Sequence, residues 1–245
     1  MITLAIPSYN RSNYVIESFM GVLSDDRISE ILIVDDNSNL EEFERLEILI
    51  SELCNHDGYE KIRLIRNQKN LGSFLNKKEC VNNSKFDWVI LLDSDNVIDS
   101  RYLNSIENKR GETTIYTPSH AICDSSILDY RQYSNTSLTK LEYARIISEG
   151  LNTSWDCILN TGNYFFSRIN YLKCIDQEAE VLESYAADAF YVIYLWMKNI
   201  QGGKLEVTEG MEYQHRLHPN SHWTVNSESS NSFVKRLSQE IVGWN

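Results

Sequence analysis

Short apolar runs alternate with amphipathic stretches over the first 116 residues of the chain. The apolar runs predict five β-strands, at residues 2–6, 30–34, 61–66, 88–92 and 113–116. Between the strands, apolar side chains recur at helical spacing, as at Phe43, Leu46 and Ile50. Strands that alternate with helices are typical of βαβ units, so the pattern predicts an α/β fold with a largely parallel sheet.

The regular alternation fades after residue 116. Residues 117–137 have no clear period, which predicts a long loop or lid. Helical spacing returns at 139–148 and 186–199, and in a tail from Glu228 that carries Phe233, Leu237 and Ile241. Short apolar runs predict further strands near residues 157–159, 204–208 and 211–215.

Four of the predicted strands are followed at once by a polar cluster. The clusters are Pro7-Ser8-Tyr9-Asn10, Asp35-Asp36-Asn37-Ser38, Asn67-Gln68-Lys69-Asn70-Leu71-Gly72 and Asp93-Ser94-Asp95-Asn96. In an open α/β sheet, ligands bind beyond the carboxyl ends of the strands, so we expect the clusters to line one crevice. Turns also attract these residue types. That alternative accounts for any one cluster better than for all four together.

The cluster from Asp93 to Asn96 places two carboxylates one residue apart at the end of a buried strand. Carboxylates this close repel each other unless a cation or protons compensate them. Hard oxygen ligands suit Mg²⁺ or Mn²⁺. The pair Asp93 and Asp95 therefore predicts a divalent metal site.

Charge and cysteine usage exclude several classes of function. The formal net charge of −12 argues against nucleic acid or an anionic membrane surface as the main partner. The five cysteines are scattered and never form C-x-x-C, which predicts neither a zinc site nor a disulfide framework. The apolar N-terminus meets Pro7 and Arg11 too early for a signal peptide, and no later run approaches ~18 apolar residues. We expect a cytoplasmic chain with no transmembrane segment.

The order of the motifs resembles a family-2 glycosyltransferase of the GT-A fold. The resemblance runs from Pro7-Ser8-Tyr9-Asn10 through Val34-Asp35-Asp36-Asn37-Ser38 and Asn70-Leu71-Gly72 to the D-x-D at Asp93–Asp95, and it covers the first 100 residues best. It implies a Rossmann-like three-layer α/β/α sandwich with a mostly parallel central sheet. It further implies one domain over residues 1–245, with a nucleotide-sugar half at 1–116, an acceptor half at 117–227 and a C-terminal helix at 228–245.

The resemblance also implies a donor site. Its residues would be Pro7, Tyr9, Asn10, Asp36, Asn70, Gly72, Asp93, Ser94 and Asp95. Pro7 and Tyr9 would form a wall for the base, and Asp36 would accept a hydrogen bond from a uracil imide. Asp93 and Asp95 would hold Mn²⁺ or Mg²⁺ against the diphosphate, where a cation stabilises the charge that builds on the leaving group.

A general base is expected at the start of a late helix, and Ala187-Asp188 occupies the place of the family's usual Glu-Asp pair. Asp188 would then deprotonate the acceptor hydroxyl, with inversion at the anomeric carbon. The alternative is an acid that only complements the helix dipole. Asp156 and Glu183 are the fallback bases.

Two later segments add candidates. Residues 160–166 resemble the part of the family that lies beneath the donor sugar and acceptor, although a turn into a buried strand accounts for them equally well. Residues 213–223 hold three of the five histidines beside an arginine. His218 or His215 would complete the metal shell, and Arg216 would neutralise phosphate.

The implied activity is the transfer of one sugar from a nucleotide-diphosphate sugar, UDP-linked by family habit, in glycan biosynthesis. The acceptor would be a glycan, a lipid-linked saccharide or a protein. The Q-x-x-R-W motif typical of processive members is absent from the sequence, which favours one sugar per encounter.

Other readings of the D-x-D remain. Residues 91–97 also resemble the nucleophile motif of a haloacid-dehalogenase-type phosphatase, with Asp93 as nucleophile, although no downstream G-D-x-x-x-D follows. An EF-hand loop fails because Ile98 and Asn104 occupy its glycine and glutamate positions. A sugar nucleotidyltransferase would need a glycine-rich basic loop after the first strand. A catalytically inactive adaptor that binds nucleotide sugars is the non-enzyme alternative.

Overall fold

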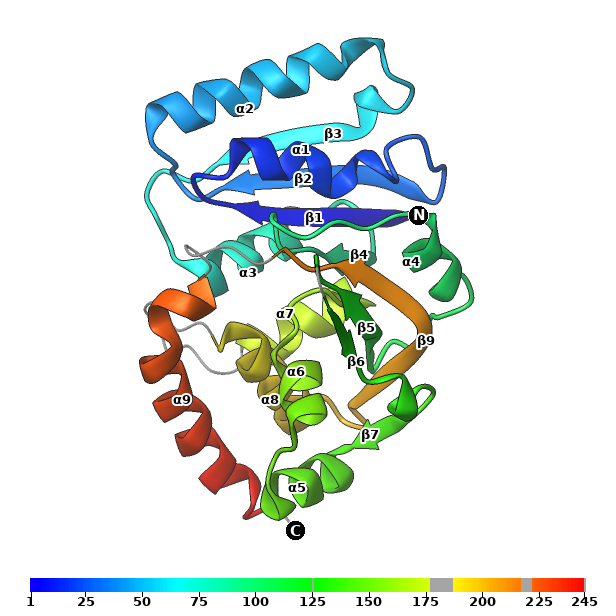
Figure 1. Ribbon diagram of the computed structural model, residues 1–245, viewed down its shortest axis with the longest axis vertical. Helices are drawn as coiled ribbons and strands as arrows, with labels where there is room; N and C mark the ends of the chain where they lie inside the picture. The colour runs from blue at the N-terminus through cyan, green and yellow to red at the C-terminus, as the bar shows by residue number, and fades with distance from the viewer. Residues whose placement is uncertain (125, 177–186, 217–221, 245) are drawn as a thin grey trace.

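The computed structural model describes residues 1–124, 126–176, 187–216 and 222–244. Over these residues a nine-stranded sheet runs in the order β3-β2-β1-β4-β8-β5-β9-β7, with β6 paired to β5 (Figure 1). The strands are β1 Ile2–Ser8, β2 Ile28–Asp35, β3 Ile62–Arg66, β4 Trp88–Leu91, β5 Thr114–Ile122, β6 Ile127–Asp129, β7 Ser137–Thr139, β8 Phe165–Ser167 and β9 Lys204–Gln214.

The helices alternate with the strands in the first half, as the hydrophobic pattern predicts. The α-helices are α1 Ser12–Met20, α2 Leu40–Glu52, α3 Ser73–Asn83, α4 Ser100–Ser105, α5 Lys140–Glu149, α6 Thr153–Asn160, α7 Arg168–Asp176, α8 Asp188–Asn199 and α9 His222–Ile241. Short 3-10 helices lie at Leu53–Asn55, Tyr59–Lys61 and Arg131–Tyr133. The sequence pattern placed the start of the last helix at Glu228, whereas α9 begins earlier, at His222.

The first four strands are parallel, which brings their carboxyl ends to one edge. β1 pairs with β2 and β4, and β2 pairs with β3. In this register Ser8 lies opposite Asp35, and Asp35 lies opposite Arg66. The α/β fold with a mostly parallel central sheet is therefore confirmed for this half, and antiparallel neighbours such as β8 enter only later.

Two apolar cores lie on opposite faces of the sheet. In β1, Leu4 and Ile6 join one core and Ala5 joins the other, because successive side chains of a strand point to opposite faces. Side chains of α1, α2 and α4 cover the first core. Those of α3, α7 and α8 cover the second. This arrangement gives the three-layer sandwich that the sequence predicts.

The region after residue 116 differs from the prediction. The predicted loop at 117–137 is wrong, because β5 continues to Ile122, with residues 114–121 all buried, and β6 and β7 follow. The strand predicted at 157–159 is wrong as well. Those residues belong to α6, where Asn152 caps the first turn by accepting from Trp155 N at 2.9 Å. A short apolar run does not distinguish a strand from a buried helix. The strands predicted at 204–208 and 211–215 are one strand, β9.

A buried carboxylate joins the first strands at the end of the sheet opposite the polar clusters. Glu30 is 2% exposed and accepts from Thr3 Oγ1 at 2.7 Å, from Arg63 Nε at 2.9 Å and from Lys85 N at 2.8 Å. It thereby connects β1, β2, β3 and the segment that leads into β4. Buried charges of this kind stabilise a fold only while their partners remain.

We expect Glu30→Ala to lower the free energy of unfolding by about 3 kcal/mol, because it removes the carboxylate partner of the Arg63 charge and the acceptor of Thr3. Glu47→Ala, at an exposed position of α2, is the matched control and should change stability little. Urea unfolding monitored by circular dichroism measures both. Equal midpoints for the two variants would show that the Glu30 network contributes no stability.

Candidate functional site

The polar clusters at the ends of β1 and β2 hydrogen-bond to each other. Asn10 N donates to Ser38 Oγ at 2.8 Å, and Asn10 Oδ1 accepts from Asn39 N at 2.9 Å. Asn10 and Asn37 hold left-handed backbone, with φ of 52° and 59°. Such backbone is uncommon outside glycine and tends to mark functional turns. Two of the four clusters thus form one hydrogen-bonded edge.

Asp36 connects this edge to the third cluster. Its carboxylate is 2% exposed and accepts from Leu71 N at 2.8 Å, from Gly72 N at 2.9 Å and from Asn67 Nδ2 at 2.9 Å. Gly72 is the residue before α3, and its φ of 82° is a backbone conformation that residues with a side chain rarely adopt. Asp36 therefore orders the loop before α3. A ligand imide would have to share oxygens that these donors already use.

The fourth cluster meets the candidate base through a lysine that the sequence did not single out. Lys77 Nζ, from α3, lies 2.8 Å from Asp93 Oδ1 and 2.8 Å from Asp188 Oδ2. Asp188 is the first residue of α8, and its Oδ1 accepts from Ala189 N at 2.9 Å. We call Asp93, Lys77 and Asp188 the charged trio. Asp188 is thus a buried carboxylate that is paired with a lysine of another helix.

The pKa shifts of Lys77 and Asp93 both favour the ionised form of these two side chains. Burial by itself would lower the pKa of Lys77, but Asp188 and Asp93 together hold the pKa well above its ordinary value. Burial by itself would raise the pKa of Asp93, whereas Lys77, with help from Arg11 and His215, holds the pKa below its ordinary value. The lysine is therefore a permanent cation between two carboxylates.

The second carboxylate of the D-x-D has its own cation. Arg11 Nη1, from the residue after the first cluster, forms an ion pair with Asp95 Oδ2, and both side chains are mostly buried. Arg11 links the end of β1 to the end of β4, so all four predicted clusters are joined by direct contacts. The four clusters therefore lie at one edge of the sheet, and the crevice that we expect them to line stays a prediction. Their roles toward a ligand stay predictions.

The remaining predicted donor residues lie along the same edge with different exposure. Tyr9 is 48% exposed, Pro7 and Gly72 are partly buried, and Asn70 is exposed. Ser94 is buried at 2% exposure. Exposed Tyr9 is thus available to a ligand base in a way that buried Ser94 is not.

Residues 161–163 pack next to Asp93 and hydrogen-bond to its backbone. Asn163 Oδ1 accepts from Asp93 N at 2.9 Å, and Tyr102 donates to the Asn163 carbonyl at 3.3 Å. A Cβ on Gly162 would lie 2.8 Å from Lys77 Nζ and 3.0 Å from Asp93 Oδ2, so only glycine leaves room for the charged trio. The sequence marked this segment only through its resemblance, and no local pattern distinguished Asn163 or Lys77.

The segment after β9 lies beside the fourth cluster, because Arg216 N donates to Asn96 Oδ1 at 3.3 Å. His215 stacks edge-on against the ring of Tyr213, with centroids 6.0 Å apart. Arg216 forms an ion pair with Glu17 and lies over the ring of Tyr14 at 4.4 Å. The phosphate role predicted for Arg216 would require it to leave Glu17. His218 and the fallback base Glu183 lie outside the described residues, and Asp156 lies exposed on α6.

The donor set for a metal at the D-x-D consists of Asp93 and Asp95. Among the described residues, no group of three or more His, Cys, Asp or Glu side chains forms a metal site. Mg²⁺ is commonly held by one or two carboxylates together with substrate phosphates. Two hard carboxylates therefore fit a metal that arrives with a diphosphate, and binding requires Arg11 to release Asp95.

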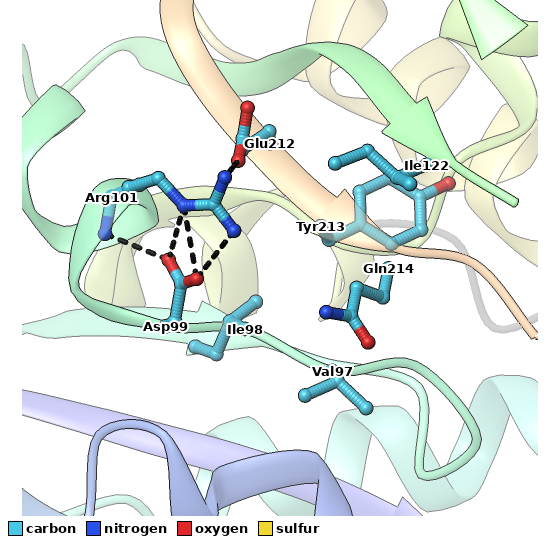
Figure 2. Close-up of a pocket in the computed structure, with 8 residues that line it drawn as sticks. All are labelled: Val97, Ile98, Asp99, Arg101, Ile122, Glu212, Tyr213 and Gln214. Carbon is cyan, nitrogen blue, oxygen red and sulfur yellow. Dashed lines mark hydrogen bonds and ion pairs between the residues drawn. The ribbon is translucent and has the colours of Figure 1, made fainter. Parts of the chain in front are cut away.

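A small pocket lies next to this site, at the end of the D-x-D segment. Figure 2 shows Arg101 of α4 between Asp99 and Glu212. Arg101 Nη2 lies 2.6 Å from Asp99 Oδ2, and Arg101 Nη1 lies 2.5 Å from Glu212 Oε1. Glu212 Oε2 also lies 2.8 Å from His120 Nε2. The charges around the pocket are paired within the protein, and they fix α4 to β9.

A family model described as glycosyl transferase family 2 matches residues 3–172. This chain belongs to that family. The match covers every strand-end cluster and the residues 161–163 behind Asp93. A search of curated protein sequences found no match to this chain.

Solved structures similar to this family-2 chain include TarS from S. aureus. TarS 1–349 in complex with UDP is 14% identical, with a TM-score of 0.63, and the alignment covers 98% of this chain and 64% of that one. The UDP-GlcNAc complex is 14% identical, with a TM-score of 0.64 and coverages of 98% and 66%. The chain thus spans about two thirds of the TarS 1–349 structure. At this identity the likeness concerns the fold.

Within the described part of the chain, no helix combines the length and the apolar character needed to span a bilayer.

Proposed function

We propose that this chain transfers a single sugar from a UDP-linked or related nucleotide-diphosphate sugar to a hydroxyl acceptor, with inversion. The observation that carries the proposal is the convergence of Asp93 and Asp188 on Lys77, 2.8 Å from each, at the carboxyl edge of the parallel strands. Family membership and the UDP and UDP-GlcNAc complexes of TarS support it. In this proposal the N-terminal half binds the donor and the C-terminal half binds the acceptor.

The donor would lie along the edge of β1, β2 and β4. Exposed Tyr9 would offer its ring to the base, and Asp36, which accepts from Gly72 N at 2.9 Å, would hold that loop against the nucleotide. Asp93 and Asp95 would hold Mg²⁺ or Mn²⁺. A divalent cation there would offset the negative charge of the departing diphosphate.

The acceptor step would belong to Asp188. The backbone N–H of Ala189 fixes one carboxylate oxygen, and Lys77 Nζ holds the other at 2.8 Å. A fixed, ionised carboxylate can accept the proton of an acceptor hydroxyl as that hydroxyl attacks. A single base on one side, with the leaving group on the other, gives inversion. The acceptor would be a glycan, a lipid-linked saccharide or a protein, within glycan biosynthesis.

A thermal-shift screen tests the donor part of the proposal. UDP-, GDP- and TDP-sugars are compared with and without Mn²⁺, and we expect the midpoint to rise most for a UDP-sugar with metal, because ligands that bind only the native state stabilise it. Donor hydrolysis is then followed for the stabilising sugar. No shift with any nucleotide sugar would refute the proposal. Binding without turnover, with or without an acceptor, would instead favour the inactive adaptor.

A further inference from the structure

Lys77 occupies a position that a helix lysine rarely takes. It belongs to α3, which packs against β1, β2 and β4, and its side chain is only 8% exposed. Lysines are seldom buried unless they are paired. Its neighbour Lys78 shows the ordinary arrangement, because Lys78 forms a surface ion pair with Asp176 at 2.7 Å. The burial of Lys77 therefore requires a reason beyond the packing of α3.

The surroundings of Lys77 enclose the charged trio. Gly162 lies so close that an added Cβ would be 2.8 Å from Lys77 Nζ. Gly162 has no left-handed backbone that would itself demand glycine, since it is not among the residues with positive φ. Two fully buried tyrosines, Tyr164 and Tyr171, lie within electrostatic reach, and burial raises the pKa of both hydroxyls. The ammonium thus lies in a confined site of low polarity, where its two carboxylate partners must offset the cost of burial.

The charges of the trio depend on one another. Asp93 comes from the end of β4, and Asp188 comes from the start of α8. Without the ammonium, two carboxylates would face each other in a partly dry site, and a buried charge that loses its partner is strongly disfavoured. The position of the Asp188 carboxylate is therefore set from α3, not by α8 alone.

We propose that Lys77 is a positioning residue that holds the Asp188 carboxylate in place for proton abstraction and couples it to the donor-side carboxylate Asp93. The proposal rests on the proposed function, in which Asp188 is the base. Lys77 acts through Asp188 and need not touch the donor. Its removal should thus slow turnover far more than it weakens donor binding.

Lys77→Met tests this with Lys78→Met as the matched control, one position away on the same helix. We expect Lys77→Met to lower kcat about 10²-fold, the usual cost of a misplaced catalytic group. The donor Kd, measured by calorimetry, should stay within about threefold of the unchanged chain. Lys78→Met should change neither. A loss of donor affinity as large as the loss of turnover would overturn the proposal, because Lys77 would then bind the diphosphate itself.

A double substitution separates positioning from general stability. If Lys77 acts through Asp188, adding Lys77→Met to Asp188→Asn should cause no further loss of turnover. An additive loss would overturn the proposal. If Lys77→Met does not fold, as judged by circular dichroism, Lys77→Gln is used instead. Transfer by Lys77→Gln at the rate of the unchanged chain would overturn the positioning role of Lys77.

A crystal structure of Lys77→Met provides a readout that needs no activity. We expect the Asp188 carboxylate to leave its position in this variant and to keep it in Lys78→Met. An unmoved Asp188 would overturn the positioning role. If the unchanged chain binds donor but transfers nothing, the proposed function fails, while this structural comparison still decides what Lys77 does.

Discussion

Asp188→Asn is expected to lower the transfer rate about 10³-fold, within the range that a general base contributes. The amide keeps the shape of the side chain and can still accept from Ala189 N, as Asp188 does at 2.9 Å. It cannot take up the proton of an acceptor hydroxyl. Donor binding should change little, because Asp93 and Asp95 remain. Transfer is measured with saturating donor and acceptor, and donor affinity by calorimetry.

Asp176→Asn is the control for this substitution. Asp176 also pairs with a lysine of α3, at 2.7 Å, but its side chain is 61% exposed. We expect its rate and donor affinity to match the unchanged chain, since exposed ion pairs contribute little. Near-normal transfer by Asp188→Asn would show that another group, such as Glu183, is the base.

Asp95→Asn is expected to weaken metal-dependent donor binding by about 100-fold or more, because losing even an outer-shell partner of a metal ligand costs about 10- to 100-fold in metal affinity. Asp95 is one of only two carboxylates that the D-x-D offers to a cation. The change also frees Arg11, which pairs with Asp95. UDP titrations with Mn²⁺, and again with EDTA, measure the effect. The unchanged chain should lose affinity on metal removal, and Asp95→Asn should show almost no difference between the two conditions.

Asp129→Asn provides the matched comparison for Asp95→Asn. Asp129 forms an ion pair with Arg131 at 2.6 Å on an exposed surface. Asp129→Asn therefore also breaks an aspartate–arginine pair, but one away from the D-x-D. This variant should lose as much donor affinity on addition of EDTA as the unchanged chain does. Equal affinity of the unchanged chain with and without metal would show that the donor binds without a divalent cation.

Much of the first half could be predicted from the sequence, because its strands are buried and run parallel. Parallel strands that are buried on both faces have continuous apolar runs, and the strand predicted at 88–92 is found as β4, Trp88–Leu91. Polar residues that follow such runs must meet at one edge, because the strands point the same way. The contact of Asn10 with Ser38 follows this logic.

The second half required the structure. The run Cys157-Ile158-Leu159 is as compatible with a strand as with α6, and only its packing against neighbouring elements decides. The predicted loop after Tyr116 begins instead as strand, because β5 continues to Ile122 with β9 as a parallel neighbour. Polar residues such as Ser119 and His120 in β5 concealed its buried character from the hydrophobic pattern.

The sequence by itself determined which strands form the parallel half of the sheet and which polar clusters share its carboxyl edge. Both follow from local periodicity and from the direction of parallel strands. The tertiary structure alone decided that Lys77 lies between Asp93 and Asp188, that Arg11 pairs with Asp95, and that Gly162 leaves them room. Those contacts join segments far apart in the chain, and charge complementarity across such distances leaves no periodic trace in the sequence.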